Sequence, residues 1–187
     1  PDYRSRRVFA FHSPETLAEW SQDHGALRHR LRELPPLDPY NLRQCQIEAV
    51  NNLEVSLSQA RSRALLQMAT GSGKTYTAIS EIYRLIKFAK ARRILFLVDR
   101  CSLGRQVKKE FQSYIPFDDN RSFTDLYIVQ HMTTNVFDPD AKVCITTIQR
   151  LFSMLKGDPD LDVSLEEKSL YESAAPDIDP QAIKFRG

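Results

Sequence analysis

One short segment, Ala-Thr-Gly-Ser-Gly-Lys-Thr at residues 69–75, constrains the fold of this chain more than any other feature. It joins an apolar run to a stretch with helical periodicity, within residues 64–91. Its two glycines let backbone amides turn inward where a side chain would obstruct a phosphate, and the following helix presents a positive N-terminus. We therefore predict a strand, a phosphate-binding loop and a helix. The residues expected to bind the nucleotide are Thr70, Gly71, Ser72, Gly73, Lys74 and Thr75.

Two residues of this loop are the expected catalytic groups. The ammonium of Lys74 would reach the β and γ phosphates, and the hydroxyl of Thr75 would bind Mg²⁺. The strict phosphate-loop pattern has a glycine at position 68, where this chain has Met68, so the match is to the relaxed form A-x-x-G-x-G-K-T. An ordinary Gly-Ser loop is the alternative. The apolar run at 64–69, suited to a buried parallel strand, and the apolar helical face that follows favour the phosphate site.

Composition indicates a soluble, cytoplasmic protein. No apolar stretch approaches the roughly 20 residues that a membrane helix needs, and the N-terminus lacks the apolar segment of a signal peptide. The three cysteines, Cys45, Cys101 and Cys144, are widely spaced and odd in number. They therefore predict neither a disulfide framework nor a zinc site, but three reduced thiols.

The positive charge is concentrated around the glycine loop. Residues 61–111 carry twelve Lys and Arg against three acidic residues, although the whole chain has a net charge of only +2. Such a cluster can attract phosphate polymers as well as nucleotides. The alternative, that these cations lie at helix C-terminal turns and on solvated faces, accounts for about half of them.

The order of the expected elements predicts two parts. Residues 1–40 read as a helical connector: a helix starts at Ser13-Pro14 and stops near Gly25, and a short helix at 26–34 ends before two prolines. Residues 41–187 read as an α/β domain that begins with a helix from Leu42 to about residue 59.

Strands and helices alternate after the glycine loop. An unbroken apolar run at 94–98 suits a central parallel strand covered on both faces, and a helix with Leu103, Val107 and Phe111 on one face follows it. Further strands are expected at 126–130 and 143–147, then a helix at 148–156 ended by Gly157. This alternation predicts a doubly wound, mostly parallel sheet, whose ligands gather at the C-terminal strand ends. Polar residues at those ends are Thr70, Asp99, Arg100, Thr146, Thr147 and Gln149.

Residues 42–46 (LRQCQ) look like the L-R-x-x-Q signature of superfamily 2 helicases. In those proteins the glutamine, here Gln46, pairs with the adenine edge, for which an amide offers one donor and one acceptor. A glutamine on a helix surface is the alternative. The position of the pentapeptide upstream of the glycine loop favours the adenine contact and makes ATP the expected nucleotide.

A wider set of segments resembles the R (restriction and translocation) subunit of type I restriction-modification enzymes. The segments are residues 7–20 (RVFAFHSPETLAEW), 66–75 (LQMATGSGKT), 93–100 (RILFLVDR) and 145–151 (ITTIQRL). The resemblance implies a RecA-like domain of an ATP-driven motor that translocates double-stranded DNA, partnered by modification and specificity subunits. A separate nuclease domain would lie upstream of residue 1.

The same resemblance assigns DNA-contacting residues. Residues 99–106 match the motif Ia region and residues 146–149 the motif Ib region, both of which face DNA in this superfamily. The residues expected to contact phosphates are Arg100, Gln106, Thr147 and Gln149. Such contacts would position a motor without reading base sequence.

The family also carries an Asp-Glu-x-His segment, which this chain lacks through Gly187. ATP hydrolysis needs the metal ligand and the water-positioning group of that segment. We therefore expect a piece of a longer protein, with a RecA-like domain incomplete at its C-terminus and little turnover alone. The alternative is a truncated, non-catalytic nucleotide- or DNA-binding module of another superfamily 2 protein. A small-molecule kinase or GTPase is disfavoured, because the Asn-Lys-x-Asp guanine signature is absent.

A second carboxylate pattern resembles a nuclease. Pro159-Asp160 and Glu166-Glu167-Lys168 fit P-D…E-x-K, which can hold a catalytic metal, but the segment lacks the strand context of such a site. It lies in an acidic stretch, residues 158–179, that is typical of a mobile surface loop. We therefore expect no nuclease site here, and the four histidines show no metal-ligand spacing.

Overall fold

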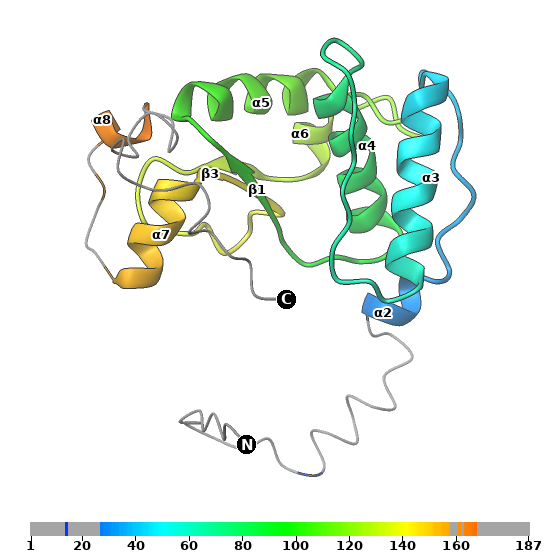
Figure 1. Ribbon diagram of the computed structural model, residues 1–187, viewed down its shortest axis with the longest axis horizontal. Coiled ribbons are helices and arrows are strands. Elements are labelled where there is room, and N and C mark those ends of the chain that lie inside the picture. The colour runs from blue at the N-terminus through cyan, green and yellow to red at the C-terminus, as the bar shows by residue number, and fades with distance from the viewer. Residues whose placement is uncertain (1–13, 15–26, 158–160, 162, 168–187) are drawn as a thin grey trace, which may run out of the picture.

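The computed structural model describes residues 14, 27–157, 161 and 163–167 (Figure 1). Among these residues, helices alternate with three short strands. The elements are α2 (Leu27–Arg30), α3 (Gln44–Ser58), α4 (Lys74–Lys87), β1 (Ile94–Val98), α5 (Cys101–Ser113), α6 (Phe123–Leu126), β2 (Val129–His131), β3 (Val143–Thr147), α7 (Ile148–Lys156) and α8 (Val163–Glu166).

The three strands form one parallel sheet in the order β1-β3-β2. β1 and β3 pair along their whole length, from Ile94 opposite Val143 to Val98 opposite Thr147. This confirms the predicted parallel α/β arrangement. Because paired parallel strands end at the same edge, residues 99–100 and 147–149 come together there.

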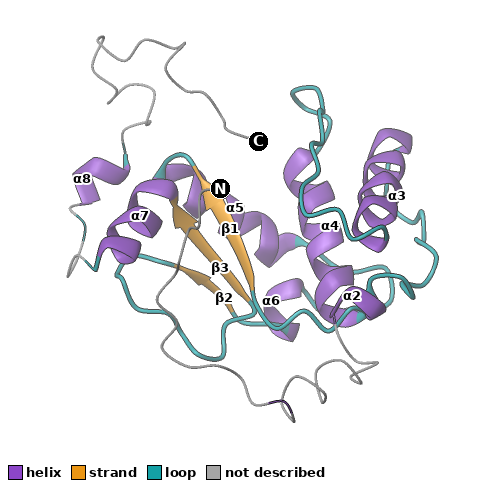
Figure 2. Cartoon of the chain, turned by 60° about the horizontal axis from the view of Figure 1, so that its bottom comes forward, coloured by secondary structure: helices purple, strands orange, loops and turns teal. Residues whose placement is uncertain are grey.

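The main core lies between the sheet and helices α4, α5 and α6. Its buried side chains include Ile82 from α4, Phe111 from α5, Phe123 from α6 and Ile145 from β3. The rings of Phe111 and Phe123 meet edge to face, 4.8 Å between centroids, a geometry that aromatic pairs prefer. α5 contacts all three strands, while α3 and α4 lie side by side at the far end of the molecule (Figures 1 and 2).

The other face of β3 has a core of its own. Cys144, which alternates with Ile145 along the strand, packs with Met132, Ala141 and Met154 of α7. Successive strand side chains point to opposite faces, so α5 and α7 cover the two sides of β3. All five residues of β3 are buried, as expected for a central parallel strand.

The prediction of a buried strand at 64–69 is wrong for this structure. These residues form no strand, and Leu65 is 90% exposed. β1, expected to be covered on both faces, pairs only with β3 among the described residues, and its Leu95 and Leu97 are exposed. An apolar cleft of about 350 Å³ lies between α3, α4 and β1. Residues 64–69 do not pair with β1 either, so the second edge of β1 has no partner strand among the described residues.

Other boundaries moved less. The strand expected at 126–130 begins at Val129, because residues 123–126 form a helix capped by Ser122, whose side chain and that of Asp125 bond each other's backbone. The helix expected at 26–34 is limited to the four residues of α2. The helix expected to start at Leu42 starts at Gln44. The predicted helix at Ser13-Pro14 lies, apart from Pro14, outside the described residues, so the boundary at residue 40 stays a prediction. No helix in the described part of the chain has the length and hydrophobicity to cross a membrane.

Candidate nucleotide-binding and DNA-binding sites

The glycine loop leads directly into α4, and two of its residues have left-handed backbone. Gly71 has φ +78° and Gly73, the N-cap of α4, has φ +83°. These conformations strongly favour glycine. At Gly73 space also matters, because an added Cβ would lie 2.3 Å from Nε2 of Gln46, whereas Gly71 faces open space.

The carbonyl side of the loop is held by side chains from α3 and α4. Nε2 of Gln46 donates to the carbonyl of Ser72 (3.0 Å), and Nη1 of Arg43 donates to that of Gly71 (3.3 Å). Nζ of Lys74 donates to the carbonyls of Met68 and Ala69, both at 3.2 Å. The backbone carbonyls are therefore turned toward donors of the protein.

The amide side of the loop is open. In the part of the chain that the structure describes, the N–H groups of Gly71, Gly73, Lys74 and Thr75 donate no hydrogen bond. They belong to the first turn of a 14-residue helix and to the loop before it, where unpaired amides and the helix dipole attract anions. The exposed ammonium of Lys74 adds a full positive charge. This combination can bind a phosphate group.

Gln46 lies close to this loop but is occupied there. It is 4% exposed, and its Oε1 accepts from the backbone N–H of Arg43 (2.8 Å) while its Nε2 holds the loop carbonyls. Pairing of Gln46 with adenine stays a prediction, and it would require these bonds to be exchanged. Sequence reasoning missed the contact of Arg43, although the arginine of L-R-x-x-Q was the available signal.

Thr75 is half-buried at the second position of α4, so its role as a Mg²⁺ ligand stays a prediction. No cluster of three His, Cys, Asp or Glu side chains within the described ranges could hold a metal. The hydroxyl of Thr75 is an oxygen donor of the kind that Mg²⁺ takes alongside nucleotide phosphates.

The second set of predicted site residues gathers where β1 and β3 end. Arg100 follows β1 as the N-cap of α5, with its side chain 3.7 Å from the carboxylate of Asp99. Gln149, on the first turn of α7, donates from Nε2 to the backbone carbonyl of Asp99 (3.4 Å). Gln106 is exposed on α5, where it contacts Glu110. The structure thus brings Arg100 and Gln149 together.

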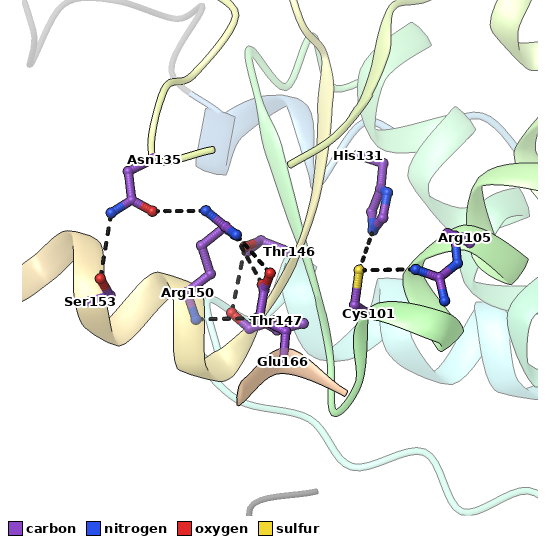
Figure 3. Close-up of polar contacts among 9 residues, drawn as sticks. All are labelled: Cys101, Arg105, His131, Asn135, Thr146, Thr147, Arg150, Ser153 and Glu166. Carbon is purple, nitrogen blue, oxygen red and sulfur yellow. Dashed lines mark hydrogen bonds and ion pairs between the residues drawn. The ribbon is translucent and has the colours of Figure 1, made fainter. Parts of the chain in front are cut away.

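Thr147 belongs to the same edge but is enclosed. It is 2% exposed, accepts from the backbone N–H of Arg150 (3.1 Å) and donates to Oε1 of Glu166 (2.6 Å) (Figure 3). Its hydroxyl is thus used to cap α7 and to hold Glu166. A DNA contact by Thr147 stays a prediction, and it would require this hydroxyl to be released.

A buried ion pair lies behind this edge, and sequence reasoning missed it. Arg150 and Glu166 are 0% and 1% exposed, with Nε–Oε1 at 3.0 Å and Nη2–Oε2 at 2.6 Å. Nη1 of Arg150 also donates to Oδ1 of Asn135 (3.1 Å). Because Glu166 is enclosed by Arg150 and Thr147, its carboxylate is not open to a metal. Pro159, Asp160 and Lys168 of the P-D…E-x-K pattern lie outside the described residues.

Cys101 and His131 meet near this edge without forming a reactive pair. Sγ of Cys101 lies 3.9 Å from Nε2 of His131 and 3.5 Å from Nη1 of Arg105. Burial raises the pKa of the Cys101 thiol and lowers the pKa of His131. Both groups are therefore neutral near pH 7, and a neutral thiol is a poor nucleophile.

Comparison with known proteins places the chain in a family. Residues 39–175 match the family model described as "Type III restriction enzyme, res subunit". The type I restriction enzyme EcoKI endonuclease subunit of Escherichia coli (strain K12) is 32% identical over 148 residues, which cover 79% of this chain and 12% of that protein. The EcoAI endonuclease subunit of Escherichia coli is 47% identical over 73 residues, covering 38% of this chain and 9% of the relative.

A more distant relative is the type I SauCOLORF180P endonuclease subunit of Staphylococcus aureus (strain COL), 25% identical over 152 residues, 81% of this chain and 15% of that protein. The chain thus spans less than a sixth of the length of these three relatives. No solved structure matches. These matches confirm the resemblance to type I R subunits, and the chain belongs to the family of restriction-enzyme res subunits.

Proposed function

We propose that this chain is the ATP-binding part of a RecA-like motor that translocates double-stranded DNA within the restriction subunit of a type I restriction enzyme. In the intact protein, ATP and Mg²⁺ bind at the glycine loop, and hydrolysis drives DNA past the enzyme to a separate nuclease. The modification and specificity subunits are its partners, and the cytoplasm is its compartment.

The observation that carries this proposal is the open amide side of the loop. The N–H groups of Gly71, Gly73, Lys74 and Thr75 are available while the carbonyls are held by Arg43, Gln46 and Lys74. A triphosphate can therefore enter without unfolding the loop. Only the bonds of Lys74 to its own loop need to be exchanged, and the ammonium then follows the phosphates.

The edge formed by β1 and β3 supports the DNA part of the proposal. Arg100 and Gln149 lie together at this edge, and Gln106 is exposed on the helix that follows. Arg and Gln donate to phosphate oxygens without distinguishing bases, which suits a motor that moves along any sequence.

Substitution of Lys74 tests the proposal in the intact restriction subunit. Lys74→Ala should abolish ATP-dependent DNA translocation, because the γ-phosphate loses its cationic partner. Lys109→Ala, which removes an exposed lysine of α5 away from the loop, is the matched control and should translocate normally. Translocation by the Lys74→Ala protein at the rate of the control would refute the proposal. ATP binding without any DNA-dependent hydrolysis by the unmodified protein would favour the non-catalytic module instead.

A further inference from the structure

We propose that Glu166 and Glu167 are positioning residues that hold the two expected DNA-contacting segments, residues 99–106 and 146–149, in one fixed arrangement. The inference rests on the proposed motor function. Neither glutamate is expected to contact DNA or ATP. Each acts through the side chains that it holds, and the two adjacent residues at the end of α8 reach two different segments.

Glu166 holds the segment after β3. Its carboxylate accepts two hydrogen bonds from Arg150 and one from Thr147, and all three residues are buried (Figure 3). Since Thr147 also caps α7, the start of that helix is fixed from both sides. Gln149 lies between these two held residues, so its side chain leaves the backbone at a defined place.

Glu167 holds the segment after β1. Its Oε1 accepts from Nη2 of Arg105 on α5 at 2.9 Å. The hydrogen bond from Arg105, and a further one from Ser102, lower the pKa of Glu167. Both partners lie on α5, between Arg100 and Gln106. The carboxylate therefore stays charged near pH 7 and keeps its hydrogen bonds to α5.

The two segments are also linked directly. Gln149 donates to the carbonyl of Asp99, and the strands before them pair up to Val98 and Thr147. The sheet thus fixes the two segments on one side, and the Glu166–Glu167 turn ties them on the other. A buried ion pair adds little net stability relative to apolar side chains of similar size. What it supplies here is a fixed position for Thr147 and Arg150.

Glu167, the exposed one of the two glutamates, gives the cleaner test. In the intact restriction subunit, Glu167→Ala should raise the DNA concentration needed for half-maximal ATPase stimulation by about threefold to tenfold, with kcat at saturating DNA unchanged. Asp119→Ala is the matched control, because it removes another Arg–carboxylate pair near the surface, Arg121–Asp119, with the same 2.9 Å separation. The control should leave the DNA requirement unchanged.

Charge exchange separates positioning from a general structural role. Arg105→Glu should raise the DNA requirement as Glu167→Ala does, and the double variant Arg105→Glu/Glu167→Arg should restore it. Equal behaviour of Glu167→Ala and Asp119→Ala, in a protein whose ATPase is stimulated by DNA, would overturn the positioning role and leave the proposed function intact. Absence of DNA stimulation from the unmodified protein would instead overturn the proposed function.

Discussion

The glycine loop and the β1–β3 edge hold their residues in opposite ways. At the loop, side chains bind the backbone carbonyls and leave the amides of residues 71 and 73–75 open. At the edge, side chains bind one another, and Thr147, Arg150 and Glu166 are buried. The difference teaches that the loop can accept a ligand once Lys74 exchanges its bonds, whereas the edge presents outer side chains such as Arg100, Gln106 and part of Gln149 and keeps Thr147 enclosed.

The largest expected effect comes from a substitution at the enclosed β1–β3 edge. Arg150→Met should lower the free energy of unfolding by about 3–5 kcal/mol, because the carboxylate of Glu166 stays buried without its partner. Denaturant unfolding measures this loss. Arg121→Ala, which removes an exposed pair with Asp119, should give no measurable change. Equal losses in the free energy of unfolding for both variants would mean that the Arg150–Glu166 pair is no more enclosed than the pair at the surface.

ATP binding by the open loop should be more sensitive to substitution of Gly73 than to substitution of Gly71. Gly73→Ala should weaken ATP binding about 100-fold, because the added Cβ meets Gln46 and the left-handed backbone is strained. Gly71→Ala has the same backbone strain but open space, so its effect should stay near tenfold. Titration with a fluorescent ATP analogue distinguishes the two. Equal losses would show that contact with Gln46 does not constrain the loop.

A third prediction concerns Glu81, which lies on α4 beside the apolar cleft. Burial, reinforced by the charge of Glu54, raises the pKa of Glu81 to about 8 from 4.5, so the folded protein keeps a proton that the unfolded chain releases. The stability due to this group is therefore complete below pH 4.5 and is lost as the pH rises to about 8. Glu81→Gln should gain on the order of 3 kcal/mol over the unmodified protein between pH 5 and pH 8.

Thermal or denaturant unfolding at the two pH values checks this gain. Glu48→Gln, at an exposed position on α3, is the control for the loss of a carboxylate at the protein surface. A Glu81→Gln protein whose stability follows the unmodified protein at every pH would mean that the carboxyl is ionised in the fold.

The smallest effect sharpens the role of Gln46. Gln46→Ala should weaken nucleotide binding about tenfold, because the loop carbonyls lose their donor. Gln44→Ala on the same helix, whose side chain donates a hydrogen bond to Glu48, should bind normally. Comparing ATP with GTP separates the two roles. An equal loss for both nucleotides indicates support of the loop, and a loss confined to ATP indicates pairing with adenine.

The sequence predicted elements with strong local signals well. β1 and β3 were located to the residue, and α7 ends at Gly157, whose φ of +82° completes the helix as a C-cap. The helix after the loop also followed from the motif. These features depend on short-range periodicity, caps and glycines, all of which are visible in a window of a few residues.

Features that depend on distant partners could not be predicted in this way. Whether residues 64–69 join a sheet depends on which strand lies beside them, and an apolar run alone does not specify that neighbour. The Arg150–Glu166 pair joins residues 16 apart on two different helices, α7 and α8. In the sequence, Glu166 stands out only as part of a nuclease-like pattern. The sequence cannot show that its carboxylate is enclosed by Arg150 and Thr147.

The free side of β1 has a practical consequence for anyone who purifies this 187-residue chain. Among the described residues no strand pairs with the second edge of β1, and this edge, flanked by the exposed side chains of Leu95 and Leu97, offers a template on which the extended backbone of another molecule can align. Concentrated solutions should therefore form oligomers through this strand. Leu97→Lys would place a charge at that border and keep the molecules apart.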